Sequence, residues 1–399
     1  MSIYSISIKL IIIFSLSILI SACQSTSSYT LQNEVPHTEL YLDDEFISSG
    51  KINIESEQEI FALDDEMKEM VNREILRYKD PKKRAKLLLK QLFSKEDINL
   101  AYQNSANLTA RQAYRNQSAN CLSLTIMAYA LAKEANLDVN FQEIKVPEYW
   151  VRNGQYNMLT GHVNLALKEP RESYKMIVYQ SEILQIDFDP EIYKRSFPKK
   201  FINKNTVIAM FYNNKGAENL VSGNYSLAYA YFKKATFIDP SFSSAWGNLA
   251  ILYKLKKRNK IAKKSYELAI ALDPNNLTAI SNLSRLLRES GEIAQSDKMN
   301  ESIHNKRYKN PYYHGLLAEE AFYNGANDNA IMHYKKAISM NRRVHEFYFG
   351  IAKVYLAQND HENAQRAMNK AITYNRVSST ESQYIAKLNL IIQASNSAD

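Results

Sequence analysis

The sequence predicts an α+β region followed by an all-α array of helical repeats, and three observations support this fold class. Glycine and proline are scarce, at 10 and 9 of 399 residues, where roughly 7% and 5% are usual. A large all-β protein needs frequent turn residues, so that class is excluded. Small residues recur every 34 positions in the second half, and strand-like patterns appear only between residues 139 and 187.

The length and composition favour a globular protein of two or three domains. Hydrophobic residues make up 45% and charged residues 23% of the chain, which excludes a disordered protein. The two cysteines cannot build a disulfide framework, and no histidine or cysteine cluster has zinc-ligand spacing. We therefore expect no metal and no other cofactor, because a phosphate-binding glycine loop is also absent from the sequence.

The first residues read as a targeting segment. Lys9 precedes an apolar run, 10–20, that is too short to span a bilayer as a mature helix. The run leads into Ser21-Ala22-Cys23, which resembles the lipobox of bacterial lipoproteins. That resemblance implies removal of residues 1–22, acylation of Cys23, a lipidated tether over 23–55, and an outer-membrane position facing the periplasm. A plain secretory signal and an N-terminal transmembrane anchor are the alternatives.

The second half carries an internal repeat. Three series of positions share a 34-residue spacing. They are Gly223, Lys257, Gly291, Gly325 and Asn359; Ala228, Ala262, Ser296, Ala330 and Ala364; and Ala235, Ala269, Ile303, Ala337 and Ala371. The spacing resembles that of the tetratricopeptide repeat (TPR), a pair of antiparallel helices per unit. The stretch from Trp246 to Tyr253 also follows that motif.

The spacing predicts five repeats over 209–378, of which the third is the most degenerate, and a capping helix with a tail over 379–399. Stacked repeats bury their core among themselves and present a binding surface. We therefore expect a solenoid that binds a protein partner, and a first half that stays soluble and folded, with a reactive Cys121, when residues 209–399 are deleted.

Positive charge is concentrated in these repeats. Residues 209–378 hold 24 lysines and arginines against 14 acidic residues, a balance of +10, which leaves −2 for the rest of the chain. Seven basic residues lie in Lys254–Lys264. A solvated helix face and a site for anionic envelope polymer or lipid are the two interpretations. Nucleic acid is not an expected partner of an exported protein.

Helical patterns cover 57–78 and 81–93, and a further helix is predicted to begin at Cys121. Asn120 is a natural N-cap for that helix, and Asn136 a natural stop. A helix N-terminus favours negative charge, and the thiolate is the reactive form of cysteine. Cys121 is therefore a candidate nucleophile; a buried, inert thiol is the alternative.

Strand patterns follow at 139–146, 162–167, 176–178 and 183–187. The motifs Ala119-Asn-Cys-Leu-Ser-Leu, Gly161-His162-Val-Asn-Leu and Leu184-Gln-Ile-Asp-Phe-Asp-Pro resemble, in order, three motifs of bacterial transglutaminase-like domains. The resemblance covers 56–205 and implies a papain-like fold. It also implies Cys121 as nucleophile, His162 as general base and acid, and Asp187 as the residue that orients the imidazole.

Other residues bear on this site. His162 is the only histidine between His37 and His304, so it is the one imidazole that the first half offers to Cys121. Asp189 competes with Asp187 for the third role, and Trp150 is a candidate for lining a substrate groove. Ala119 replaces a glycine common in the family, and it would be strained if that position required positive φ.

The sequence thus favours an envelope-anchored cysteine hydrolase (a peptidase or amidase) or acyltransferase that acts on an amide bond, fused to a TPR solenoid. The alternative is a non-catalytic TPR scaffold lipoprotein for the assembly of envelope proteins or polysaccharide.

Overall fold

The computed structural model describes residues 37–47, 52–93, 101–102, 106–153, 156–167, 184–188, 197–375 and 384–391. The chain divides into two compact units, Met1–Glu39 and Leu40–Asp399. Only the last residues of the first unit are described. They enter the short 3-10 turn η1 (Thr38–Leu40). The predicted signal peptide and the lipidation residue Cys23 lie outside the described residues.

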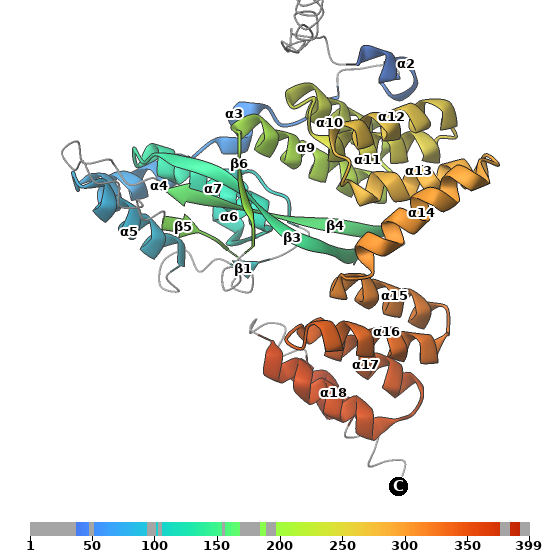
Figure 1. The fold of residues 1–399 in the computed structure, drawn as a ribbon. Coiled ribbons are helices and arrows are strands. Elements are labelled where there is room, and N and C mark those ends of the chain that lie inside the picture. Colours follow the sequence, from blue (N-terminus) through green and yellow to red (C-terminus); the bar gives the residue numbers. More distant parts are fainter. Residues whose placement is uncertain are drawn as a thin grey trace, which may run out of the picture. The chain divides into compact units, whose positions relative to one another are not determined.

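The first half of the second unit combines short helices with two small sheets (Figure 1). The helical elements are α2 (Asp43–Phe46), α3 (Glu57–Phe61), α4 (Asp65–Met70), the π-helical turn η2 (Val71–Leu76), α5 (Pro81–Phe93), α6 (Ala110–Asn116) and α7 (Cys121–Glu134). The strands are β1 (Ala101–Tyr102), β2 (Ser118–Ala119), β3 (Val139–Asn153), β4 (Tyr156–Leu167), β5 (Leu184–Ile186) and β6 (Lys199–Ile202).

The larger sheet has the order β5-β4-β3-β6, and all its neighbouring strands are antiparallel. β3 and β4 form a long hairpin whose register shifts between Ile144 and Tyr149. The hairpin extends beyond the predicted strands, which ended at residue 146 and began at residue 162. β6 was not predicted, because its exposed edge residues show no apolar alternation. The predicted strand 176–178 lies outside the described residues.

The predicted single helix over 57–78 is wrong. The chain is extended at Ala62, and the Asp64 side chain then accepts a hydrogen bond from the Met67 amide and begins a new helix. Both predicted ends of α7 are confirmed. The Asn120 side chain accepts a hydrogen bond from the Ser123 amide at 2.9 Å, and Asn136 takes a left-handed conformation (φ 51°) after the last turn.

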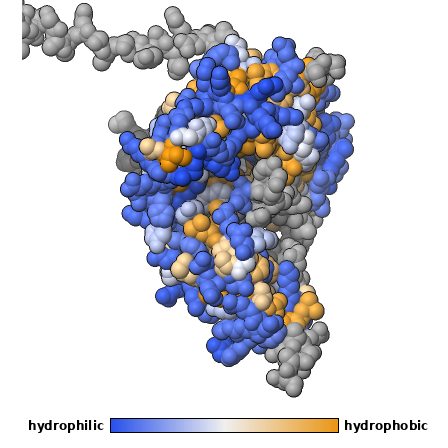
Figure 2. Space-filling model, turned by 90° about the vertical axis from the view of Figure 1, so that its right-hand side faces the viewer, coloured by the Kyte–Doolittle hydropathy of each residue, from blue (hydrophilic) through white to orange (hydrophobic). Residues whose placement is uncertain are grey.

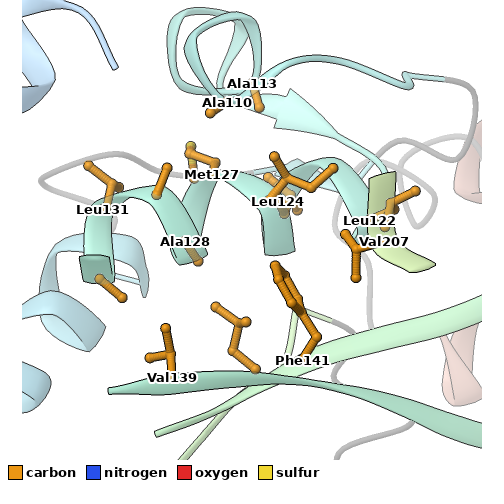
Figure 3. Close-up of a cluster of buried hydrophobic side chains, with 14 of the residues drawn as sticks. Ala110, Ala113, Leu122, Leu124, Met127, Ala128, Leu131, Val139, Phe141 and Val207 are labelled. Carbon is orange, nitrogen blue, oxygen red and sulfur yellow. The ribbon is translucent and has the colours of Figure 1, made fainter. Parts of the chain in front are cut away.

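Helix α7 is the centre of the first half's core and is buried on nearly all sides. Figure 3 shows Val139 and Phe141 of β3 below it and the alanines of α6 above it. Apolar side chains on opposite sides of a helix require packing layers on both sides. The sheet, α6 and the helices before it supply those layers.

The second half consists of five pairs of antiparallel helices followed by a helical segment at 384–391. The pairs are α9 (Lys204–Val221) with α10 (Tyr225–Ile238), α11 (Ser243–Leu255) with α12 (Asn259–Leu272), α13 (Leu277–Glu289) with α14 (Ile293–Arg307), α15 (Pro311–Tyr323) with α16 (Asn327–Met340), and α17 (His345–Ala357) with α18 (His361–Tyr374).

The turn inside each pair has the same backbone conformation. The five positions that share the first 34-residue series all have positive φ. They are Gly223 (78°), Lys257 (59°), Gly291 (85°), Gly325 (74°) and Asn359 (59°). Glycine adopts this conformation without a steric penalty, which explains why three of the five turns use it.

The two halves share one core. Buried side chains of α9, among them Val207, Phe211 and Tyr212, belong to the same apolar cluster as α7 and β3. This shared core argues against the expectation that the first half folds without the solenoid. The first repeat supplies its apolar face to the domain before it as well as to the repeat after it.

Candidate functional site

Cys121 is the first residue of α7, and the residue is 7% exposed. The first backbone hydrogen bond of the helix runs from the Leu124 amide to the Asn120 carbonyl at 3.0 Å. The amides of Cys121 and Leu122 therefore precede the intrahelical ladder, as the first amides of any helix do. Amides in this position can stabilise an oxyanion that forms beside the sulfur.

His162 and Asp187 meet on neighbouring strands. His162 lies on β4, and Asp187 directly follows β5; the two strands pair with Leu165 opposite Ile186. Nε2 of His162 lies 2.8 Å from Oδ1 of Asp187, and both side chains are at most 3% exposed. A carboxylate at Nε2 fixes the ring orientation and leaves Nδ1 for another partner.

Cys121 adjoins this pair. Its sulfur lies 3.7 Å from the carbonyl oxygen of Gly161, the residue before His162. Burial acts to lower the pKa of His162, but the hydrogen bond to Asp187, the neighbouring Cys121 and the charge of the carboxylate raise it from 6.5 to about 10. The structure thus brings together Cys121, His162 and Asp187, an arrangement that can hold a thiolate beside an imidazolium.

A fourth polar residue completes the carboxylate's surroundings. Asn164 donates from Nδ2 to Oδ2 of Asp187 at 2.9 Å and is 1% exposed. Each oxygen of Asp187 therefore has its own partner, His162 on Oδ1 and Asn164 on Oδ2. Asn164 is not among the predicted site residues. Its spacing of two from His162 on a strand was the available signal, since alternate residues share a face.

The turn that leads into Cys121 is held by the segment before α6. The carbonyl of Ala106 accepts the Asn120 amide at 3.0 Å, and the Leu108 amide donates to the Ser123 hydroxyl at 2.8 Å. Between them, buried Asn107 donates from Nδ2 to the Phe211 carbonyl of α9 at 3.1 Å. The start of α7 is therefore hydrogen-bonded, through one short segment, to the first repeat.

The remaining candidates are placed as follows. Trp150 lies in β3, with the Arg307 guanidinium 5.1 Å from its ring and the Tyr313 ring 6.2 Å away, so it contacts the solenoid. Its role in substrate binding stays a prediction. Asp189 lies outside the described residues. Ala119 lies in the extended strand β2, and positive φ occurs instead at Gln117, so the alanine is not strained at this position.

The basic segment Lys254–Lys264 covers the turn between α11 and α12. Three of its seven cations have acidic partners on other elements: Lys254 with Glu289, Arg258 with Glu45, and Lys263 with Glu292, at 2.7–2.9 Å. These pairs leave Lys256, Lys257, Lys260 and Lys264 as the remaining cations of the segment, all exposed. Three of the seven positive charges are thus balanced by acidic residues within the protein.

Comparison with known families bears out the repeats. The tetratricopeptide repeat model matches residues 243–276 and 345–377, which are the second and fifth helix pairs. The C-terminal half is a TPR solenoid, a class of fold that generally binds protein partners through its extended surfaces.

Similar proteins resemble part of the chain. The uncharacterized protein ycf37 of Cyanophora paradoxa is 35% identical over 94 residues, 23% of this chain and 55% of that protein. Protein O-mannosyl-transferase TMTC3 of Homo sapiens is 27% identical over 131 residues, 31% of this chain and 14% of that protein. The chain thus spans about half or less of the length of these relatives.

Solved structures are also similar to only part of this chain. PilF of Pseudomonas aeruginosa is 18% identical, with a TM-score of 0.30, over 49% of this chain and 89% of that one. YrrB, a TPR protein with an unusual peptide-binding site, is 17% identical, with a TM-score of 0.25, over 46% and 94%. Scores this low carry no functional information.

Within the described part of the chain, no helix is both long enough and apolar enough to cross a bilayer. Hydrophilic residues dominate the face drawn in Figure 2, where apolar residues form separate groups.

Proposed function

We propose that the first half carries a thiol-dependent activity on amide bonds, through a papain-like Cys121–His162–Asp187 site of the transglutaminase-like kind. The observation that carries this proposal is the 2.8 Å contact between Nε2 of His162 and Oδ1 of Asp187, with the Cys121 sulfur 3.7 Å from the carbonyl oxygen of Gly161, the residue before His162. Burial alone disfavours a charged imidazole. A ring held charged between a carboxylate and a thiol is therefore a feature expected of a site built for proton transfer.

The chemistry follows from these atoms. The Cys121 sulfur attacks the amide carbonyl, and the amides at the start of α7 receive the oxyanion. The imidazolium of His162 gives its proton to the departing amine, so a thioester forms as the C–N bond breaks. Water attacks that thioester in a hydrolase and gives one proton to His162, which regenerates the thiolate pair; an amine in place of water gives a cross-link. Asp187 stays ionised and orients the ring throughout.

A test uses an activated ester that needs no substrate specificity. Purified protein incubated with p-nitrophenyl acetate should gain one acetyl group on Cys121, detected by intact-mass and peptide mass spectrometry. The acetyl group should be absent in Cys121→Ser and form much more slowly in His162→Ala. Equal rates in the wild type and His162→Ala would overturn the activity.

A non-catalytic scaffold is the second candidate, and two observations favour it. The family match falls on the repeats alone, and the Cys121 thiol is buried with a backbone carbonyl at 3.7 Å, as for a packed thiol. In this case the solenoid binds envelope proteins or polysaccharide, and the first half is structural. The acetylation test separates the two candidates, because a scaffold gives no His162-dependent acyl transfer.

We also propose that the protein is lipid-anchored at the outer membrane through Cys23, with the solenoid available to a protein partner. The support is the lipobox-like sequence before Cys23 and the stable anchoring that several acyl chains provide. Cys23→Ser should leave the protein out of the membrane fraction and unlabelled by a fatty-acid probe. Membrane retention of this variant at full precursor mass would instead indicate a transmembrane anchor.

The exposed lysines around the turn of Lys254–Lys264 then offer a contact with anionic envelope lipid or polymer. Surface charges attract anions within about 10 Å at moderate salt. Binding of the protein to phosphatidylglycerol vesicles, measured by co-sedimentation, should weaken in a Lys256/Lys257/Lys260/Lys264→Gln variant. Unchanged binding would leave these lysines as a solvated surface.

A further inference from the structure

The solenoid is interrupted between its third and fourth helix pairs. Elsewhere α10 packs on α11, α12 on α13, and α16 on α17, whereas α14 and α15 share little packing. The buried residues of one apolar cluster end at Leu287 in α13, and those of the next begin at Ala318 in α15. The solenoid therefore has a first arm (α9–α14) and a second arm (α15–α18 with 384–391).

The degenerate third repeat lies on one side of this interruption. Where other repeats pack alanines, a buried hydroxyl of Ser284 bonds to Ser296 at 3.0 Å and to Asn300 at 2.7 Å. The last residue of α14, Arg307, is 8% exposed. Polar groups at this depth need partners, and Arg307 finds its partner outside the solenoid.

The β3–β4 hairpin crosses the interruption (Figure 1). Arg307 donates two hydrogen bonds, at 2.8 and 2.9 Å, to the carboxylate of Glu148 in β3. Asn310, the N-cap of α15, donates to the Glu148 carbonyl at 2.7 Å, and the Tyr149 ring meets Tyr312 at 5.1 Å. Glu148, with its neighbour Tyr149, therefore joins both arms at the point where they share little packing of their own.

The other strand of the hairpin also touches both arms. Met158 of β4 packs against the apolar cluster of the first arm, and Asn157 donates to Glu320 of the second arm at 3.3 Å. Both strands of the hairpin thus contact both arms of the solenoid.

Glu148 and Tyr149 form a clamp between the two arms, and this clamp lies close to the candidate site. Tyr149 pairs with Thr160, two residues before His162 on the same strand. The register shift between Ile144 and Tyr149 lies between the clamp and the residues opposite His162. A displacement of Glu148 therefore acts on the part of β4 that carries the imidazole.

Cys121 is anchored to the solenoid at another place. Its turn is held by 106–109, and Asn107 in that segment bonds to Phe211 of α9, in the first repeat. The nucleophile is thus tied to the beginning of the first arm, and the histidine strand to its end.

We propose that the solenoid is the frame that sets the separation of Cys121 and His162, and that Arg307 is a positioning residue of this site. The inference rests on the proposed function. A protein partner that changes the angle between the two arms would move the hairpin and so strengthen or weaken the thiolate–imidazolium pair. The site responds because β4 joins the clamp to His162 directly.

The test compares Arg307→Met with Arg288→Met, an arginine of the same repeat that pairs with the exposed Asp297 of α14. Full-length proteins are alkylated with iodoacetamide at pH 6 and at pH 9.5, and the ratio of the two Cys121 rates is measured. Hydrogen exchange of 156–167 is followed in parallel. If Arg307→Met does not fold, Arg307→Lys replaces it in the comparison. This variant keeps the positive charge but loses the paired hydrogen bonds to the Glu148 carboxylate.

Arg307→Met should lower the pH 6 to pH 9.5 ratio several-fold and speed exchange in β4, while Arg288→Met changes neither. The double swap Glu148→Arg with Arg307→Glu should recover part of the ratio. A wild-type ratio in Arg307→Met, with a lowered ratio in His162→Ala, would overturn the inference and leave the proposed function intact. If His162→Ala itself has the wild-type ratio, the proposed function fails, and exchange in 156–167 alone decides whether Arg307 holds the strand.

Discussion

The core around α7 and the core of the solenoid are built from contacts of different range. In the solenoid each helix packs on helices within the same or the next repeat. Around α7 the buried cluster joins residues from Ile60 to Tyr212 and extends to Ala245, so it closes only when distant segments meet. Because of this difference, the solenoid should tolerate removal of its C-terminal repeats, whereas the α7 core depends on the first repeat.

The largest expected effect comes from cutting at this boundary. A chain that ends at residue 203 lacks α9, whose Val207, Phe211 and Tyr212 complete the α7 core. We expect this fragment to show no cooperative thermal transition by circular dichroism. A chain that ends at Asn310 keeps α9–α14 and should melt cooperatively. Cooperative melting of the shorter fragment would show that α7 has a sufficient core of its own.

Single substitutions should distinguish the stability of the α7 core from that of the second arm of the solenoid. Phe211→Ala and Phe347→Ala each remove a buried ring, at a cost of about 3–5 kcal/mol. Because the two rings belong to separate clusters, Phe211→Ala should destabilise the α7 core, and Phe347→Ala only the second arm. Hydrogen exchange resolved by segment measures this. Equal loss of protection everywhere in both variants would mean that the chain unfolds as one unit.

The second arm should also lose stability in acid. Nδ1 of His314 lies 3.4 Å from Nδ1 of His333, and burial, first of all, lowers the pKa of both below 6.5. Below about pH 6.5 the unfolded chain therefore binds more protons than the folded chain. The second arm has its full stability above that pH and loses stability as the pH falls below it. Melting of the second arm between pH 7.5 and 5 should show this dependence, and His333→Gln should reduce it. A melting temperature independent of pH would contradict it.

The smallest expected effect lies in the turns. Lys257 occupies a position where Gly291 stands in the next repeat, and both have positive φ. Lys257→Gly should stabilise the protein by about 0.5–1 kcal/mol in urea unfolding, because relief of backbone strain exceeds the added freedom of the unfolded chain. Gly291→Ala, whose added Cβ would meet nothing within 4 Å, should destabilise it by a similar amount. No gain in Lys257→Gly would show that the turn carries no strain.

The features that could be predicted from the sequence are those that local rules determine. The 34-residue spacing and the caps of α7 are such features, since each depends on neighbours along the chain. The strands that carry His162 and Asp187 could be located approximately, and the resemblance to transglutaminase-like domains implied that the two strands are adjacent. The contact of Glu148 with Arg307, 159 residues apart, has no local signal. For the same reason the sharing of α9 between the two cores was not foreseen.

The most direct test of the central claim is the alkylation rate of Cys121 as a function of pH in the wild type and in His162→Ala. A thiolate–imidazolium pair keeps the sulfur reactive at pH 6, where an ordinary thiol, with a pKa of about 8.5, is almost fully protonated. We predict that His162→Ala slows alkylation at pH 6 by a factor on the order of 10–100 and leaves the rate at pH 9.5 nearly unchanged. Equal rates in the two proteins at pH 6 would contradict the pair and leave the scaffold as the function of the protein.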